Sequence, residues 1–232
     1  MAENKNDIAW KKLFNELKIL NAIQKTGSFK ISSKQINQHR ESRLMTKFNH
    51  TTNLPKLFSD NDLSILPISR GEYLIGPFEA YTKLEYQKSL KPKIVNFPKN
   101  IQSIDFSNIY SEAAALNCSF VTGIINEIAG EICLPTLSGR MSTSEFDYSI
   151  KNKTTSKNFN ISVSDSQCEI DGGYECKSSL IIIEAKNYLV DNFLIRQLYY
   201  PYRLWENRVK KPVIPVFLTY SNNIFSFFYL RI

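Results

Sequence analysis

The apolar run LIII at residues 180–183, followed directly by Glu184, Ala185 and Lys186, constrains the fold more than any other stretch of this chain. Four apolar residues, three of them β-branched, are typical of a strand that is buried on both faces. A glycine pair upstream and an asparagine downstream limit the length of the element, which favours a strand over a helix. The sequence therefore predicts a central strand whose end carries two charged residues.

The spacing of a further acid gives these charges a role. Glu184 and Lys186 are two residues apart, so they lie on the same face of the strand. Twelve residues separate Asp171 from Glu184, which is enough for a hairpin to bring the two carboxylates together. Two carboxylates repel each other unless a cation compensates, and Mg²⁺ prefers one or two carboxylates together with water and phosphate oxygens. The Ala185 carbonyl is a further candidate ligand, and Lys186 would orient a water molecule or stabilise phosphate charge.

This pattern, Asp171 followed after twelve residues by Glu184-Ala185-Lys186, resembles the PD-(D/E)XK nuclease superfamily, and within it a type II restriction endonuclease. The resemblance implies that Asp171 and Glu184 bind Mg²⁺ and that Lys186 assists the attacking water. It also implies an α/β (α+β) fold, in which helices flank a mixed sheet.

Simpler interpretations compete with this one. An acid and a lysine two residues apart often form only a surface ion pair, which contributes little to stability. Within the nuclease interpretation, Ile170 stands where a proline often precedes the first acid, and Glu169 and Glu175 are rivals for the role of Asp171. The buried run before Glu184 favours the metal-site hypothesis over the surface ion pair.

The charge of the chain is unevenly distributed. The 232 residues carry a formal net charge of +7. The first hundred residues hold 17 Lys/Arg and 9 Asp/Glu, whereas the remainder holds 12 and 13. A basic half suits a polyanionic partner such as double-stranded DNA, and the near-neutral half contains the predicted acid cluster.

The sequence favours a cytoplasmic protein with no membrane partner. No apolar run approaches the roughly 18 residues that cross a bilayer, and the N-terminus lacks the apolar core of a signal peptide. The four cysteines show no CxxC spacing and there are two histidines, so a structural zinc site is not expected. We expect Cys118, Cys133, Cys168 and Cys176 to be free thiols.

Residues 1–90 are expected to form a winged-helix-like DNA-binding module. Residues 7–25 predict one amphipathic helix that ends at a glycine. A short helix is expected from Ser32 or Ser33, and a third over residues 39–48. Residues 63–78 predict a hairpin, which completes the three helices and hairpin of a winged helix.

Basic residues recur on this module at positions suited to DNA. Arg40, Arg43 and Lys47 recur at helical spacing on the third helix, with Leu44, Met45 and Phe48 directed inward. The third helix of a winged helix enters the major groove, where arginine contacts phosphates or guanines. Arg70, at the tip of the hairpin, would contact backbone phosphate. The competing interpretations are an ordinary solvated helix face and a dimerisation surface.

A stretch rich in lysine and proline separates this module from the rest of the chain. Residues 91–108 are expected to form a linker or an extended arm. Residues 109–232 are expected to form the nuclease domain.

The nuclease domain is expected to begin with one long helix over residues 110–130. Its acids Glu112 and Glu127 are candidates to join the metal site, and Glu127 is retained as a ligand. Arg140, in a flexible loop beyond this helix, is a candidate for a phosphate or base contact.

Three further segments complete the predicted domain. Residues 160–170 alternate in polarity and predict the strand that leads to the first acid. Residues 191–209 predict a helix, in which Gln197 would line the catalytic cleft and Trp205 would lie in the core. Residues 212–232 predict two strands joined by a turn at residues 221–223.

The sequence thus predicts a type II restriction endonuclease that hydrolyses double-stranded DNA with Mg²⁺. Cutting at a palindromic site implies a homodimer, and the family resemblance implies a partner DNA methyltransferase. One alternative is a repair nuclease or junction resolvase of the same superfamily. The other is a DNA-binding regulator with a degenerate nuclease fold.

Overall fold

The computed structural model describes residues 4–87 and 89–231, which form two compact units of mixed helix and sheet. The first unit comprises the chain up to Thr82 together with Ser142–Gln167 and Asn192–Arg196. The second comprises Lys83–Met141, Cys168–Asp191 and the chain from Gln197 onward. The sequence predicted two domains joined by a single linker at residues 91–108. In the structure, the first unit also includes the two later segments Ser142–Gln167 and Asn192–Arg196.

The N-terminal helical pattern is divided between two helices of the first unit, α1 (Lys5–Glu16) and α2 (Ile19–Thr26). Lys18 between them adopts a left-handed conformation with φ of 49°. The single helix predicted over residues 7–25 was therefore wrong in its continuity. Gly27 ends α2 at φ of 84°, as predicted, because glycine adopts this conformation without steric cost.

Two short helices follow, as the sequence predicted, but the second is shorter than expected. α3 (Ser33–Asn37) is capped by the side chain of Ser32. α4 (Ser42–Thr46) has five residues. Met45 and Phe48 are buried, as predicted, whereas Leu44 on α4 is 47% exposed rather than directed inward.

Three antiparallel strands form the sheet of the first unit in the order β1-β3-β2. The turn between β2 and β3 contains Arg70, as predicted. The elements of this region are, in chain order, β1 (Phe29–Ser32), a 3-10 turn (Thr51–Asn53), α5 (Lys56–Ser59), β2 (Ser64–Pro67) and β3 (Glu72–Gly76).

The later segments of the first unit contribute paired strands. β6 (Phe146–Lys151) pairs with β7 (Asn158–Val163), and β10 (Asn192–Leu194) pairs with β4 (Tyr81–Lys83). The single strand predicted over residues 160–170 was therefore wrong. β7 ends at Val163, and the chain turns at residues 164–166 before it enters β8.

A core of aromatic side chains holds the helices of the first unit together. Trp10 is fully buried, and its Nε1 donates a hydrogen bond to the Met45 carbonyl at 3.0 Å. The Phe58 ring lies edge-on to Trp10 and to Phe14, at 4.8 and 5.4 Å between ring centroids. Burial of each such ring stabilises the fold by about 1.5–3 kcal/mol.

Five strands form the mixed sheet of the second unit, in the order β12-β11-β9-β8-β5. β9 (Leu180–Lys186) lies at the centre and is buried along its whole length, as the apolar run predicted. It runs parallel to β11 and antiparallel to β8. The remaining strands are β5 (Cys133–Ser142), β8 (Gln167–Cys176), β11 (Val213–Ser221) and β12 (Ile224–Tyr229).

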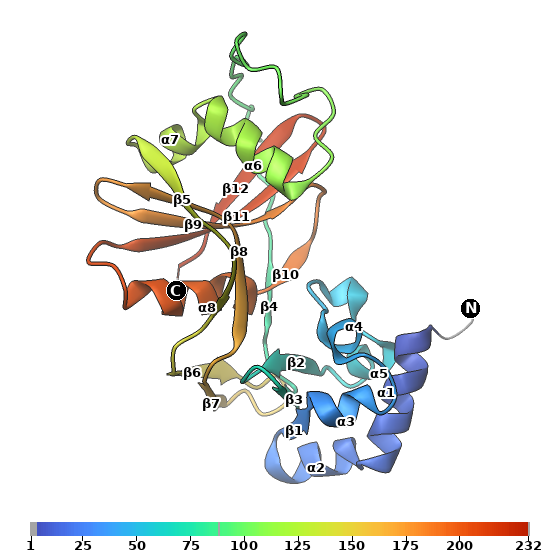
Figure 1. The fold of residues 1–232 in the computed structure, drawn as a ribbon. Coiled ribbons are helices and arrows are strands. Elements are labelled where there is room, and N and C mark those ends of the chain that lie inside the picture. Colours follow the sequence, from blue (N-terminus) through green and yellow to red (C-terminus); the bar gives the residue numbers. More distant parts are fainter. Residues whose placement is uncertain (1–3, 88, 232) are drawn as a thin grey trace. The chain divides into compact units, whose positions relative to one another are not determined.

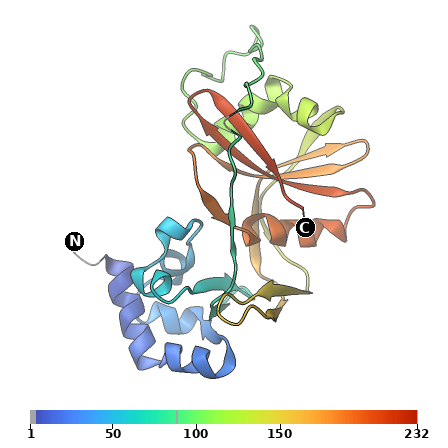
Figure 2. The same ribbon diagram turned by 180° about the vertical axis from the view of Figure 1, so that it is seen from behind.

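Helices cover both faces of this sheet (Figures 1 and 2). α6 (Glu112–Val121) and α7 (Ile124–Ala129) lie on one face, where Leu116 packs in one apolar cluster with the β9 residues Ile181 and Ile183. α8 (Arg196–Glu206) lies on the opposite face.

Two helix predictions in this unit differ from the structure. The helix predicted over residues 110–130 is divided because Gly123 adopts φ of 78° between α6 and α7. The helix predicted over residues 191–209 begins at Arg196, because residues 192–194 form β10; Pro201 lies inside it. The turn between β11 and β12 is formed by Asn222 and Asn223, as predicted. No helix among the described residues is long and apolar enough to cross a membrane.

Cys133 and Cys176 form a disulfide that joins β5 to β8. The expectation of four free thiols was therefore wrong for this pair. The two cysteines are 43 residues apart in the sequence, and only the pairing of the strands brings them together. Cys118 and Cys168 are buried and lie outside this disulfide.

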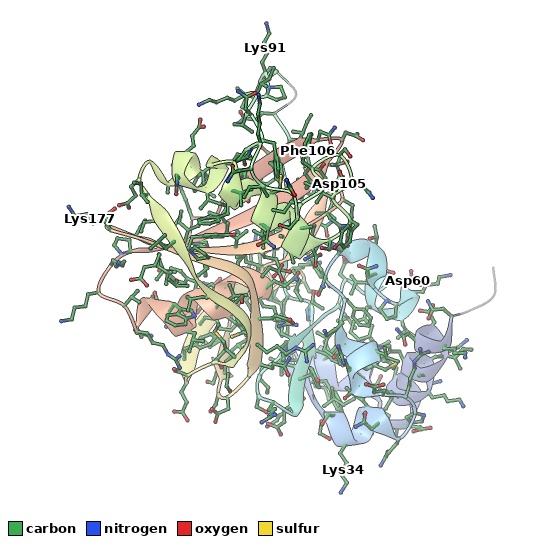
Figure 3. All side chains as sticks on the ribbon, turned by 45° about the horizontal axis from the view of Figure 1, so that its top comes forward. Lys34, Asp60, Lys91, Asp105, Phe106 and Lys177 are labelled. Carbon is green, nitrogen blue, oxygen red and sulfur yellow. A yellow bond between two sulfur atoms is a disulfide. The ribbon has the colours of Figure 1, made fainter. Side chains whose placement is uncertain are left out.

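The long segment between β4 and α6 contains no helix or strand among its described residues. Lys91 points outward from this loop (Figure 3). Phe97 stacks on Phe106 at 4.8 Å between ring centroids, and the Lys93 ammonium lies 2.6 Å from the Glu127 carboxylate. These contacts attach an otherwise extended loop to itself and to α7.

The close approach of β8 and β5 depends on Gly173. A Cβ at this position would lie 2.6 Å from the Leu137 Cβ, which cannot move without its backbone. We expect Gly173→Ala to lower the free energy of unfolding by about 1–3 kcal/mol, measured by urea denaturation. Gly172→Ala is the matched control with a smaller expected loss, because the nearest atoms, at 3.1 Å or more, belong to the ends of the Leu116 and Tyr174 side chains. A Gly173→Ala protein as stable as the wild type would contradict this packing.

Candidate active site

The charged end of β9 is buried. Glu184 and Lys186 are 6% and 5% exposed. They alternate with Ile183 and Ala185, which belong to the apolar cluster beneath α6 and α7. Two ionisable side chains at the end of an apolar strand carry a desolvation cost of several kcal/mol, so their contacts decide whether the arrangement is stable.

The β8–β9 pairing brings Asp171 to this end of the sheet. Gly172 pairs with Ile183, so Asp171 and Glu184 occupy the next positions on the two strands. The Ala185 N–H donates a hydrogen bond of 2.8 Å to Asp171 Oδ2. The hairpin that the sequence required to unite the two acids is thus present.

Lys186 lies among oxygen atoms. Its Nζ is 2.7 Å from Glu184 Oε1, 2.6 Å from the Ala185 carbonyl oxygen and 3.3 Å from Oε1 of Glu112 on α6. Each of these contacts is a charge-assisted hydrogen bond or ion pair, which stabilises the buried ammonium. The same contacts fix its position relative to the carboxylates.

Gln197, in the first turn of α8, also belongs to the cluster. Its Nε2 donates a short hydrogen bond to Glu184 Oε1. Its Oε1 is buried and has no hydrogen-bond partner among residues 4–87 and 89–231. An unsatisfied buried acceptor costs about 1–3 kcal/mol, so this oxygen is suited to a water molecule or a cation.

Burial and neighbouring charge shift the ionisation of all three groups. Burial raises the pKa of Glu184 from its ordinary 4.5 to about 8, against the opposing effect of the Lys186 ammonium. Burial also raises the pKa of Asp171, although the Ala185 N–H and the Lys186 ammonium act the other way. Burial alone would lower the pKa of Lys186, yet the surrounding carboxylates, first that of Glu184, hold it above its ordinary value.

A divalent cation fits this donor set. Both hydrogen bonds to Glu184 fall on Oε1, which leaves Oε2 without a partner among the described residues. Asp171 uses Oδ2 for the Ala185 N–H, and the orphaned Gln197 oxygen lies in the same cluster. The described residues contain no group of three or more His, Cys, Asp or Glu arranged as a metal site. Mg²⁺ nevertheless needs only one or two carboxylates, with water completing its shell.

A groove opens beside Asp171. It has a volume of about 390 Å³ and lies between α6, β5 and β8. Its polar lining comes from Asn117, Thr136, Ser138 and Asp171. Asp171 therefore adjoins a hollow that offers amide and hydroxyl groups to a ligand.

The structure brings Glu112, rather than Glu127, to the cluster. Glu127 is paired with Lys93 on the surface and is half-exposed. Glu112 stands in the first turn of α6, where its oxygen reaches Lys186. Both acids were candidates from the sequence. The local signal for Glu112 is the preceding Ser111, a residue type that caps helices, which places Glu112 in the first turn of α6.

The other predicted residues of the second unit lie apart from the buried cluster. Arg140 is on strand β5 rather than in a flexible loop, and its Nε is 3.7 Å from Glu169. Glu175, the other rival for the first acid, pairs with Lys211 at 2.9 Å. Trp205 is partly exposed rather than buried in the core.

The DNA-contacting residues predicted for the winged-helix-like module lie in the first unit. Arg43 is exposed on α4, and Lys47 is exposed at its end. Arg40 is partly buried and precedes α4, so these three residues do not share one helix as predicted. Arg70 is exposed at the β2–β3 turn.

Comparison with protein families gives two matches. Residues 76–231 match a domain of unknown function (DUF6997), and residues 7–75 match a domain of unknown function (DUF6996). The two matches meet at the end of β3, at Gly76. No curated protein and no solved structure matches the chain.

The raised pKa of Glu184 predicts a pH dependence of stability. Between pH 4.5 and about 8 the folded state holds a proton that the unfolded state has lost, so stability decreases as the pH rises through this window. The slope from this group reaches up to about 1.4 kcal/mol per pH unit. We expect Glu184→Gln to reduce the slope, measured by urea unfolding at pH 5, 6, 7 and 8 in EDTA.

Glu175→Gln is the control, since it removes a half-exposed acid from the adjacent strand β8. This variant should retain the slope of the wild type. Identical slopes for wild type and Glu184→Gln would show that Glu184 does not hold the proton.

Proposed function

We propose that this chain, which belongs to the family defined by the domain of unknown function DUF6997, is a Mg²⁺-dependent nuclease that hydrolyses DNA phosphodiester bonds. The observation that carries the proposal is the convergence of Asp171, Glu184 and Lys186 at the buried end of β9, beside an open groove. A structural ion pair would need neither the second carboxylate nor the groove.

The element order of the second unit supports a fold of the PD-(D/E)XK kind. A helix (α6) precedes the strands, the acids lie on the β8–β9 hairpin, and a second helix (α8) follows before β11 joins the sheet in parallel. The resemblance seen in the sequence implies such a mixed sheet flanked by helices. Fold alone does not establish an activity, so the argument rests on the residues at the site.

The protein's own residues have distinct roles in this proposal. The Lys186 ammonium, held by Glu184 and the Ala185 carbonyl, orients the attacking water and stabilises negative charge on the phosphate. Gln197 holds the Glu184 carboxylate through its Nε2 and offers its free oxygen to a water molecule. Glu112 limits the movement of the lysine side chain from the α6 side.

Asp171 and Glu184 would hold the cation, with the Ala185 carbonyl as a third oxygen. When bound, Mg²⁺ supplies Lewis-acid polarisation of the phosphate and neutralises part of its charge. Because burial raises the pKa of Glu184 to about 8, cation binding near neutral pH must displace the proton of this carboxyl group.

The first unit supports DNA as the substrate. Its helices α3 and α4, followed by the β2–β3 hairpin, occur in the order expected of a winged-helix-like module. Arg43, Lys47 and Arg70 are exposed on α4 and on the hairpin. In this proposal α4 enters the major groove and Arg70 contacts backbone phosphate, which adds affinity and sequence choice to the reaction.

Within this proposal the protein acts as a type II restriction endonuclease. Cleavage of both strands at a palindromic site requires a homodimer. The family resemblance further implies a methyltransferase that protects the host's own sites. A resolvase or repair nuclease of the same superfamily would instead cut according to DNA structure, and a regulator would bind without cutting.

Incubation with unmethylated phage DNA tests the proposal. We expect discrete fragments with Mg²⁺ and none with EDTA. Lys186→Met should lower the cleavage rate by about 10²–10⁴-fold, because it removes the group that orients the water. Glu184→Gln should abolish detectable cutting while DNA binding in EDTA persists.

Glu175→Gln, on strand β8, is the matched control and should cut as the wild type does. Circular dichroism and the unfolding midpoint of each variant show whether it is folded. Cleavage by a folded Glu184→Gln protein would place the active site elsewhere. Binding of DNA by the wild type without cutting, on methylated and unmethylated substrates, would favour the regulator.

Cation binding has a readout that does not depend on activity. We expect 5 mM Mg²⁺ (roughly ten times a weak Kd) to raise the free energy of unfolding by about 1–2 kcal/mol at pH 8, and by less at pH 6, where protons compete. Asp171→Asn should remove this stabilisation, whereas Glu175→Gln should preserve it. A Mg²⁺ effect of equal size in Asp171→Asn would contradict the assignment of the ligands.

A further inference from the structure

A second hollow lies in the first unit, between α1 and the turn that joins α3 to α4. Its volume is about 420 Å³, and it is lined by Lys5, Ile8, Ala9, Lys12, His39 and Arg40. Apart from Arg40, these residues have no role in the proposed contacts of α4 and the β2–β3 hairpin. The hollow therefore needs an explanation of its own.

Three cationic side chains line this hollow without an ion-pair partner in the described part of the chain. Lys5, Lys12 and Arg40 have no ion pair among the described residues, and no acid lines the hollow. Of the two acids on α1, one contacts a lining residue and the other is engaged outside the hollow. Glu16 lies 2.9 Å from His39 Nε2, and Asp7 accepts a hydrogen bond of 2.8 Å from the Lys56 N–H. Three cations that face one hollow repel each other, and a bound anion would offset that repulsion.

The walls of the hollow are held in fixed positions. Trp10 of α1 donates a hydrogen bond to the Met45 carbonyl, and Asn6 Nδ2 donates one of 2.9 Å to the Leu44 carbonyl. Asn37 Oδ1 accepts a hydrogen bond of 2.7 Å from the Ser42 N–H across the α3–α4 turn. A site that is formed before its ligand arrives loses less conformational entropy on binding.

We propose that this hollow binds a phosphate group of a nucleic-acid backbone. Lys5, Ile8 and Lys12 recur at helical spacing along one face of α1, so an apolar side chain lies between two ammonium groups. Ile8 is 44% exposed and offers a contact surface for the sugar that joins successive phosphates. The inference rests on the proposed function in so far as DNA is the ligand, and it adds a backbone contact on α1.

Salt-dependent DNA binding in EDTA tests this inference. The logarithm of the DNA-binding constant decreases as the logarithm of the salt concentration rises. Each lysine that neutralises one phosphate adds about 0.9 to the magnitude of this slope, so the loss of two such lysines reduces the magnitude by about 1.8. We expect Lys5→Ala/Lys12→Ala to show this decrease and to lose about 10- to 100-fold in affinity for duplex DNA near 0.1 M salt.

The control is Lys25→Ala/Lys34→Ala, which removes the same charge from the same unit. Neither residue lines the hollow, and Lys34 points away from the body of the unit (Figure 3). The control should keep the wild-type slope. A decrease in slope for Lys5→Ala/Lys12→Ala no larger than that of the control would overturn the inference.

Two further measurements distinguish a backbone phosphate from a free anion, and this inference from the proposed nuclease site. In the first, inorganic phosphate or AMP is added and the free energy of unfolding is measured. If either anion stabilises the wild type but not Lys5→Ala/Lys12→Ala, while the two proteins show the same salt dependence of duplex binding, the hollow binds a free anion and the backbone assignment is overturned. Because binding is measured in EDTA, the result does not depend on cleavage. Asp171→Asn should retain the wild-type slope, so failure of the nuclease site would leave this test intact.

Discussion

The organisation of the second unit depends on one costly interaction, the buried pair of Glu184 and Lys186 at the end of β9. Taking two charges out of water costs several kcal/mol per ion, and their mutual attraction offsets this only when the remaining lone pairs and protons are satisfied. The surrounding elements supply those partners. Gln197 from α8 donates a hydrogen bond to Glu184, and Glu112 from α6 pairs with Lys186. Asp171 from β8 accepts a hydrogen bond from the intervening Ala185 N–H, so each contact fixes one element against the central strand. Two hydrophobic residues of similar volume would give the folded state an equal or greater free energy of unfolding at this position. We therefore interpret the cluster as a candidate site rather than as a source of stability.

Much of what the sequence predicted correctly depends on short-range patterns. The apolar run identified β9, the glycine after α2 marked the end of that helix, and the asparagine pair marked the β11–β12 turn. The spacing allowed a hairpin to bring Asp171 beside Glu184, and the β8–β9 pairing confirms this position. Gln197 also lies at the cluster, although its helix begins later than predicted.

The remaining features depend on contacts between distant segments, which no local pattern reveals. The Cys133–Cys176 disulfide requires β5 beside β8, and the separation of β7 from β8 follows from its pairing with β6. The choice of Glu112 over Glu127 depends on which turn of α6 or α7 approaches β9. The break between α1 and α2 rests on the left-handed Lys18, a residue type that gives no signal for that conformation.

The proposed activity depends on a divalent cation that binds between Asp171 and Glu184. Anomalous diffraction from crystals grown with Mn²⁺ in place of Mg²⁺ tests this binding most directly. We expect an anomalous peak in contact with both carboxylates, and none there in Glu184→Gln crystals. Crystals that bind Mn²⁺ at other positions while Lys186 and Glu184 remain paired and metal-free would contradict the claim and leave the cluster as a structural ion pair.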